Sequence, residues 1–380
     1  MPITPSYPGV YIEELDGLSF SVSNTATAVP AFVADDIDTI FGNTNGDVLT
    51  IYSWLDYQNK AAYIPPEQTE EDAEVTLLTN TTEDGTEPQT TGIEARRDAC
   101  MRIYFENGGG RCYLVKKSAL VQQIPLLQDV TLLVASGHAI QSEVATLCQD
   151  GKNLFAILDG PEVEVIDESW KVDYDTTAYA AVYYPWLKAK WSTFNLPPSA
   201  AIAGAYCAND GARGVWKAPA NMTLRGGLLP IFKISDEIQG QYNSDKALNM
   251  IREFDVGSAV IWGARTTQDD DSWRYVPVRR LFNSAEKDIQ NAMQSAMFEP
   301  NSQPTWEEVR SSINSYLYGL WKQGALSGAT PEQAFFVSIG KDITMTEGDI
   351  NQGKMIVKVG MAAVRPAEFI ILQFTQDVNQ

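Results

Sequence analysis

The sequence has few of the residues on which most catalytic sites depend. It contains one histidine, His138, among 380 residues. A catalytic triad, a histidine relay and a histidine-rich metal site are therefore nearly excluded. His138 follows Ser136 and Gly137 after a predicted strand, so we interpret it as a loop histidine and not as a catalytic one.

Cysteine is also scarce. Four cysteines stand at positions 100, 112, 148 and 207, and no two of them have C-x-x-C spacing. The absence of this spacing argues against a zinc site or a redox-active dithiol. We expect reduced thiols, three of them in apolar surroundings, as in proteins of the cytosol.

Basic residues and long apolar runs are lacking as well. Lys and Arg number 28 against 49 Asp and Glu, which gives a net charge of −21. Nucleic acid and anionic membranes are therefore disfavoured as partners, because both attract basic surfaces. No window approaches the roughly 18 apolar residues of a membrane-spanning helix, and the N-terminus has no signal-peptide pattern. The acidity fits either simple solubility or subunits that must not associate prematurely.

The remaining motif candidates are incomplete. Residues 107–111 (Asn-Gly-Gly-Gly-Arg) lack the pattern of a phosphate-binding loop and precede a predicted strand instead of a helix. Residues 269–271 are three aspartates without the spacing of a calcium loop. The adjacent glutamates at 13–14 and 307–308 do not converge on one face. We therefore expect no catalytic, cofactor-binding or metal site, and no cofactor.

What is present is an alternation of short apolar runs and helical patterns, which predicts an α/β layer with several parallel strands. The first of these runs is residues 29–33. The patterns predict strands over 112–115, 130–135, 154–158 and 178–184, and helices over 94–105, 142–150 and 200–207.

A second series follows Gly227. Apolar stripes predict helices over 284–298 and 306–321, the latter opened by a capping box at Thr305 and closed at Gly324. The same reading predicts a helix over 245–254 and strands over 257–265, 273–277, 334–339, 354–364 and 369–374.

Two stretches do not fit this α/β rhythm. Residues 64–94 contain many Asp and Glu but no Lys or Arg, so we predict a solvent-exposed acidic insertion. Residues 10–12 (Val-Tyr-Ile) predict a strand, but it is isolated between Pro8-Gly9 and a small polar linker. A strand this short must pair with a sheet elsewhere.

Several blocks together resemble the contractile tail sheath proteins of myophages, tailocins and phage-like injection systems. The blocks follow the family order, and they are residues 7–14 (Tyr-Pro-Gly-Val-Tyr-Ile-Glu-Glu), 104–113, 180–186, 197–204, 213–221, 298–301 with Trp306, and 349–353 with 365–370. The acidic insertion has no counterpart in this pattern.

The resemblance implies an α/β (α+β) multi-domain sheath-subunit fold, with an α/β middle domain, a C-terminal α/β domain and two terminal arms that add strands to neighbouring subunits. We accordingly expect an arm and linker over 1–28, a middle region over 29–225 with the insertion 64–94, a sheath domain over 226–364 and a second arm over 365–380. The residues expected to pair between subunits are Tyr7, Val10, Tyr11, Ile12, Phe369, Ile370, Ile371, Leu372 and Phe374.

The function implied is mechanical. Subunits would polymerise helically around an inner tube, alone or with sheath paralogues, and contract to drive the tube through an envelope. Baseplate and terminal cap proteins would be further partners, and neither nucleic acid nor membrane insertion is expected. Assembly would occur in the bacterial cytoplasm, with possible release of the particle. In the innermost domain, the exposed face of the helix at 306–322 would contact the tube through Glu307, Arg310, Asn314 and Lys322.

Two alternatives remain open at this stage. An α/β enzyme, such as a carboxylate-dependent hydrolase, would be a monomer or small oligomer with a concave polar pocket. A non-contractile tail structural protein would polymerise without shortening, although tube proteins are usually much shorter than this chain.

Overall fold

A computed structural model describes residues 21–61, 92–165, 167–255 and 257–369. The predicted N-terminal strand, most of the acidic insertion and the C-terminal strand from Ile370 onward lie outside the described residues. Contacts divide the chain into two compact units. We call Thr25–Lys287 with the segment from Ala363 the sheet unit, and Asp288–Ala362 the C-terminal unit, and describe each separately.

The sheet unit is built on nine strands in the order β2-β3-β1-β4-β5-β6-β10-β11-β8. The six strands from β3 to β10 run parallel, while β2, β11 and β8 pair antiparallel. Their bounds are β1 Pro30–Ala34, β2 Val48–Ile51, β3 Cys112–Lys116, β4 Leu132–Val134, β5 Phe155–Asp159, β6 Ala180–Tyr184, β8 Met222–Thr223, β10 Leu248–Glu253 and β11 Ala259–Ile261. A small second sheet pairs β7 (Leu187–Lys188) with β9 (Leu229–Pro230).

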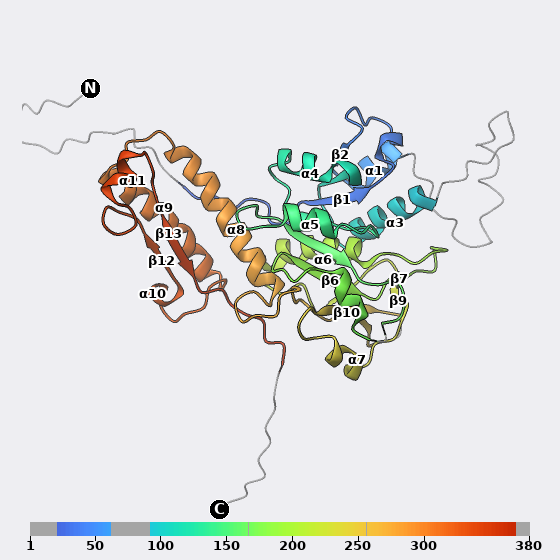
Figure 1. Ribbon diagram of the computed structural model, residues 1–380. Coiled ribbons are helices and arrows are strands. Elements are labelled where there is room, and N and C mark those ends of the chain that lie inside the picture. The colour runs from blue at the N-terminus through green and yellow to red at the C-terminus, as the bar shows by residue number, and fades with distance from the viewer. Residues whose placement is uncertain (1–20, 62–91, 166, 256, 370–380) are drawn as a thin grey trace, which may run out of the picture. The chain divides into compact units, whose positions relative to one another are not determined.

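The central strands are apolar along their whole length because both faces of the sheet are covered. Every residue of β1 and of β6 is buried. One face packs against α1 (Trp54–Ala61), α3 (Gly92–Glu106) and α6 (Pro198–Arg213). The other packs against α4 (Leu120–Gln123), α5 (Gln141–Leu147) and α7 (Asp236–Gln241). Figure 1 shows these helices on the two sides of the strands, and the predicted α/β layer is confirmed.

The glycine-rich stretch after α3 is a turn that lets two helices approach closely. Gly108 follows the end of α3 by two residues and has φ of 98°, and a Cβ on it would lie 2.8 Å from that of Ala208 on α6. Asn107 accepts the backbone N–H of Arg225 at 2.8 Å, which holds the turn against the following part of the chain. The interpretation of 107–110 as a helix-to-strand turn is therefore confirmed.

Two sequence predictions in the sheet unit are wrong. The predicted helix over 245–254 is strand β10, whose first four residues are buried between β6 and β11. The predicted strand over 273–277 is a turn that leads into α8 (Val276–Met293), which carries Pro277 in its first turn, where proline is tolerated. In both places sheet and helix packing overrides a short local pattern. The predicted helix over 284–298 begins earlier and ends earlier, at Met293.

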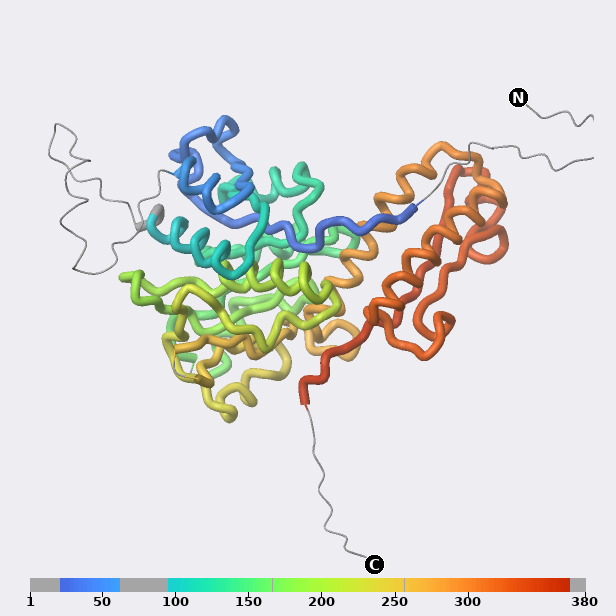
Figure 2. The backbone as a smooth tube through the Cα atoms, turned by 180° about the vertical axis from the view of Figure 1, so that it is seen from behind, coloured from blue at the N-terminus to red at the C-terminus, as the bar shows by residue number. Residues whose placement is uncertain are grey.

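The C-terminal unit packs one long helix on a two-stranded ribbon. It contains α9 (Gln303–Lys322), α10 (Pro331–Ala334), β12 (Phe335–Ser338), α11 (Glu347–Asn351) and β13 (Lys358–Met361). The predicted apolar stripe of α9 is confirmed, since Trp306, Val309, Ile313, Leu317 and Leu320 are buried. Figure 2 shows α9 beside the ribbon from behind.

The start of α9 differs from the prediction. The helix begins at Gln303, so Thr305 lies inside it and is not a capping residue. The capping box of this unit opens α11 instead, where Thr346 and Asp349 bond reciprocally. The division of the chain by contacts, at residue 287, also differs from the predicted boundary at 225, and the fold of residues 226–364 as one domain stays a prediction.

Within the described ranges, no helix is long and apolar enough to cross a membrane. All four cysteines are free thiols, and three of them are buried.

Candidate functional site

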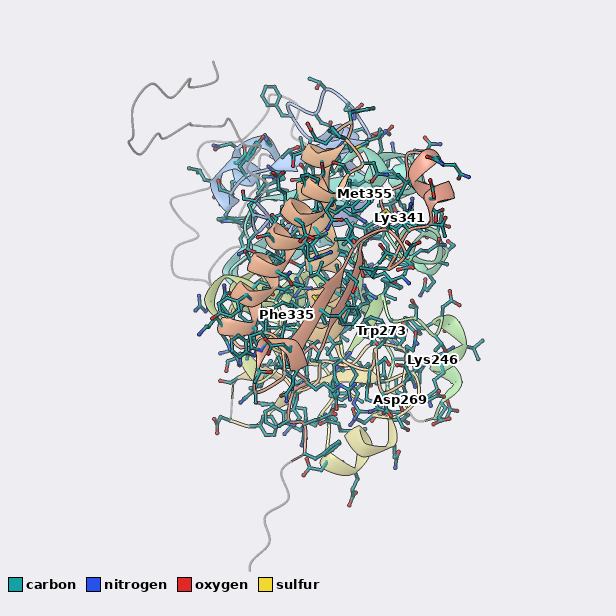
Figure 3. All side chains as sticks on the ribbon, turned by 90° about the vertical axis from the view of Figure 1, so that its left-hand side faces the viewer. Lys246, Asp269, Trp273, Phe335, Lys341 and Met355 are labelled. Carbon is teal, nitrogen blue, oxygen red and sulfur yellow. The ribbon has the colours of Figure 1, made fainter. Side chains whose placement is uncertain are left out.

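The motifs considered for chemistry have structural partners in the folded chain. His138 Nδ1 lies 3.2 Å from the carbonyl of Ala135, and its Nε2 lies 3.4 Å from Asp35 Oδ2. Asp270 accepts the N–H groups of the turn that follows it, and Asp269 accepts the N–H of Asp245 at 3.0 Å. Figure 3 shows Asp269 and Lys246 in neighbouring loops. Among the described residues, no group of three His, Cys, Asp or Glu could hold a metal ion.

The segment through which the N-terminal arm enters the sheet unit is held by a buried ion pair. Arg280 on α8 donates to Asp210 on α6 at 2.6 and 3.0 Å, and the two side chains are only 3% and 5% exposed. Thr27 donates its hydroxyl to Asp210 at 2.6 Å, and its carbonyl accepts from Arg280 at 3.2 Å. We call Thr27, Asp210 and Arg280 the N-terminal clamp.

The segment that leads to the C-terminal arm is held in a similar way. Glu368 accepts from Arg265 Nη2 at 2.6 Å and from Arg265 Nε at 3.0 Å, and it accepts the hydroxyl of Tyr275 at 3.1 Å. The Arg265 side chain is 10% exposed and that of Glu368 is 22% exposed. Burial and the nearby Glu368 charge raise the pKa of Tyr275, so its hydroxyl stays protonated and able to donate. We call Arg265, Tyr275 and Glu368 the C-terminal clamp.

Neither clamp was predicted from the sequence. Their partners are 70 and 103 residues apart, so no local pattern joins them. The available signal was an arginine inside an apolar stretch, as in Val276-Pro-Val-Arg-Arg-Leu-Phe282, because a charged side chain in a buried segment requires a partner.

The predicted arm residues lie almost entirely outside the described residues. Phe369 is the last residue described, and its side chain is 70% exposed, with the ring 6.0 Å from the Arg265 guanidinium. The pairing of the arms with neighbouring subunits therefore stays a prediction. The remaining predicted arm residues, which the structure does not describe, are Tyr7, Val10, Tyr11, Ile12, Ile370, Ile371, Leu372 and Phe374.

The predicted tube-facing residues lie on the polar side of α9, but three of them have partners within the C-terminal unit. Arg310 donates to Glu307 at 2.9 and 3.0 Å, and to the carbonyl of Ile339 at 2.5 Å. Lys322 lies 5.4 Å from the ring centres of Tyr318 and Trp321. Glu307 is exposed, and Asn314 is half-buried. Arg310 therefore stabilises the fold of the C-terminal unit in addition to lying on its polar face.

Comparison with known proteins assigns the chain to a family. Residues 268–377 match the family model of the phage tail sheath C-terminal domain. The chain is 53% identical to a chain of the contracted sheath of PVC, an extracellular contractile injection system, with 99% of both chains covered and a TM-score of 0.84. The chain belongs to the contractile tail sheath family.

Other sheath proteins are more distant. A chain of the contracted helical sheath of the anti-feeding prophage is 41% identical, with a TM-score of 0.76 over 98% of this chain and 100% of that one. A prophage major tail sheath protein of Pseudomonas aeruginosa and the tail sheath protein of Vibrio phage KVP40 are each 24% identical. The matches cover 62% and 59% of this chain, and they span only 62% and 32% of those two curated relatives.

The interpretation of the sequence as a contractile-sheath subunit is confirmed. The proteins it resembles come from phage tails and extracellular contractile injection systems, and none of them supports the alternative of a carboxylate-dependent hydrolase.

The C-terminal clamp leads to a first prediction. Replacing Glu368 with alanine removes the acceptor of five hydrogen bonds, from Asn243, Arg265 and Tyr275, and leaves Arg265 without its carboxylate. We expect the free energy of unfolding to fall by about 1–3 kcal/mol, since the pair is only partly buried. Chemical denaturation of the soluble full chain measures this change. Glu347→Ala, which removes an exposed pair with Lys341, is the control, and an equal loss in both variants would argue against the clamp.

Proposed function

We propose that this sheath subunit polymerises helically around an inner tube protein in an extended, metastable state and contracts to drive the tube through a target envelope. The sheath contains this chain alone or together with sheath paralogues. Support comes from its 53% identity over 99% of its length to a chain seen in a contracted sheath. The energy of contraction is stored in the assembly, so the cycle needs neither nucleotide nor cofactor.

The observation that carries the polymer model is the two-stranded ribbon of the C-terminal unit. Within the described residues, β12 and β13 pair only with each other, which leaves the outer edge of each strand available for a ladder. A ribbon of two strands is marginal by itself, and an added strand extends it by β-augmentation. The N- and C-terminal arms of neighbouring subunits are the strands we assign to these edges.

The two clamps explain how force on an arm would reach the folded subunit. Tension on an arm is transmitted to the points at which the chain is fixed in its own subunit. Thr27 is such a point for the N-terminal arm and Glu368 for the C-terminal arm, and each is bonded to a buried or nearly buried arginine. Both arms are therefore anchored in the sheet unit.

We assign the further partners from the same relatives. A chain of the anti-feeding prophage baseplate structure is 41% identical to this one, which supports contact with a baseplate at one end of the sheath. A terminal cap protein closes the other end. Assembly takes place in the bacterial cytoplasm, and the particle is released afterwards.

Negative-stain electron microscopy of the purified full-length chain tests polymerisation. We expect hollow cylinders, because relatives of this chain form helical sheaths. Uniformly dispersed particles at every protein concentration and ionic strength would contradict the proposed function.

The tube contact is assigned to the polar face of α9 and leads to a second prediction. The face must release its partner on contraction, and exposed ion pairs contribute only about 0–1 kcal/mol each. Because Arg310 also bonds the carbonyl of Ile339, its replacement would disturb the unit itself. Lys322→Glu is the cleaner probe, since Lys322 lies over the rings of the exposed Tyr318 and the half-buried Trp321.

We expect the Lys322→Glu chain to polymerise alone but to form fewer extended sheaths on tubes, as counted in micrographs of mixed assemblies. Lys354→Glu introduces the same charge change at an exposed lysine outside α9 and should assemble normally. Normal extended sheaths from Lys322→Glu would rule out this contact.

A further inference from the structure

The sheet unit contains a cavity of about 510 Å³ that the sheath function does not use. It is lined by the end of β1, by Leu114 of β3, by the loop Ser136 to His138 that follows β4, and by four residues of α3, which are Arg96, Arg97, Cys100 and Met101. In the sheet, β1 lies between β3 and β4. The chain enters β3 from α3 on one face and leaves it through α4 on the other, so the cavity lies at the point where the connections change sides. Open α/β sheets bind ligands at this point, outside the carboxyl ends of their strands.

Arg96 brings to this cavity a positive charge that no carboxylate of the described residues pairs with. Its neighbour Arg97 pairs with Asp36 at 2.6 Å and with Asp98 at 3.0 Å. Arg96, in contrast, makes no ion pair with any carboxylate of the described residues, although the chain as a whole is strongly acidic. A half-buried guanidinium without a carboxylate partner is suited to an anion from outside the chain.

The position of Arg96 is fixed by packing. Its guanidinium lies 5.6 Å from the ring centre of Trp186, whose indole N–H donates to the carbonyl of Gly160 at 2.8 Å. Gly137 provides the space for the side chain, because a Cβ there would lie 3.3 Å from Arg96 Cδ, and its φ of 83° favours glycine. Arg96 is therefore held in place before any ligand arrives, which reduces the entropy lost on binding.

Ser136 supplies a second unsatisfied group in the cavity wall. Its side chain is 4% exposed, and its Oγ has no hydrogen-bond partner within the described part of the chain. Its backbone N–H is fixed by Ser199 Oγ at 2.9 Å, and its φ is 51°, an uncommon value for a residue other than glycine. A buried hydroxyl without a partner costs free energy, which a bound acceptor would recover.

We propose that this cavity binds a small organic anion. Its charged oxygens accept hydrogen bonds from Arg96 and from Ser136 Oγ, while its apolar body packs on Phe32, Met101 and Leu114. A volume of about 510 Å³ lies within the roughly 300–1,000 Å³ typical of ligand pockets. Both carboxylates of the cavity wall have partners of their own, since Asp36 pairs with Arg97 at 2.6 Å and Asp35 Oδ2 lies 3.4 Å from His138 Nε2. One free guanidinium favours a singly charged head group over a highly charged one.

Titration calorimetry on the full-length chain tests the proposal with three probes. Benzoate carries a carboxylate on an apolar ring, benzyl alcohol carries the same ring without a charge, and inorganic phosphate carries a charge without an apolar body. We expect benzoate to bind at least about tenfold more tightly than benzyl alcohol or phosphate, because a hydrogen bond to a charged group is worth more than tenfold in affinity.

Two variants and one control separate the site from general charge effects. Arg96→Gln should weaken benzoate binding by about tenfold or more, and Ser136→Ala by a smaller factor. Arg213→Gln removes an exposed arginine at the end of α6 and should leave binding unchanged. If circular dichroism shows that Arg96→Gln does not fold, the conservative Ser136→Ala variant tests the proposal by whether its affinity for benzoate falls.

The proposal is overturned if benzoate gives no binding to the wild-type chain. Equal losses in Arg96→Gln and Arg213→Gln, or phosphate binding as tight as benzoate, overturn it as well. The cavity is formed by one chain alone, so failure of benzoate to bind overturns this proposal without bearing on whether the chain forms a sheath.

Discussion

Replacing Arg280 with leucine is expected to lower the free energy of unfolding of the sheet unit by about 3–5 kcal/mol, because the substitution leaves a buried carboxylate without its partner. Asp210 is 5% exposed and accepts from Arg280 at 2.6 and 3.0 Å. The substitution also removes the donor to the Thr27 carbonyl and the guanidinium 4.6 Å from the Tyr206 ring. Denaturant unfolding of the soluble full chain measures the loss.

Two further variants make the result interpretable. Arg280→Met combined with Asp210→Leu removes both charges, and we expect it to recover much of the lost stability, since a buried pair can often be replaced by apolar residues. Arg111→Leu is the matched surface control, because Arg111 and its partner Asp129 are 43% and 40% exposed, and it should cost no more than about 1 kcal/mol. An Arg280→Leu chain as stable as the Arg111→Leu chain would contradict the clamp.

The elements that could be predicted are those whose burial leaves a regular pattern of apolar residues in the sequence. Strands β1 and β6 are buried on both faces, so their residues form continuous apolar runs. The stripe of α9 recurs every three or four residues because one face of a long helix packs against the ribbon. In both cases the local pattern of apolar residues indicates which faces of the whole element are buried.

The wrong secondary-structure predictions fall on short segments whose structure is decided by contacts and not by the local sequence pattern. Residues 248–253 have apolar residues at both helical and strand spacing, and pairing with β6 and β11 decides for the strand. The turn before α8 is held by Asp270, which accepts the N–H groups of Ser272 and Trp273, and this allows the helix to begin at Val276. The pairing of β10 is a tertiary contact that a local window does not encode, whereas the turn at Asp270 is local and its signal was not recognised.

The clamps and the cavity could not be predicted, because each depends on residues that only the fold brings together. Arg280 and Asp210 are 70 residues apart, and Arg265 and Glu368 are 103 apart. The same holds for Arg96 and Ser136, which reach the cavity from α3 and from the loop after β4. The family resemblance indicates that arms exist, whereas the described structure identifies the points at which they are fixed.

Deleting residues 1–17 is expected to abolish sheath formation while leaving a folded, soluble subunit. The deletion ends before Thr27, so the N-terminal clamp keeps its bonds to Asp210 and Arg280, and the free energy of unfolding should remain close to that of the full chain. A short strand contributes only a few hydrogen bonds of about 0.5–1.5 kcal/mol each, but every joint of the sheath depends on it. Denaturant unfolding and electron microscopy of the same preparation measure the two quantities.

Two point variants distinguish the loss of strand pairing from the mere shortening of the N-terminus. Tyr11→Pro removes a ladder N–H and should reproduce the deletion, whereas Tyr11→Val keeps a residue that favours strands and should assemble. If the deletion also unfolds the subunit, the arm serves its own chain and the assignment to a neighbour is wrong. Sheaths of normal length from the deletion or from Tyr11→Pro would contradict the proposed pairing, because polymerisation would then rest on surfaces other than the arms.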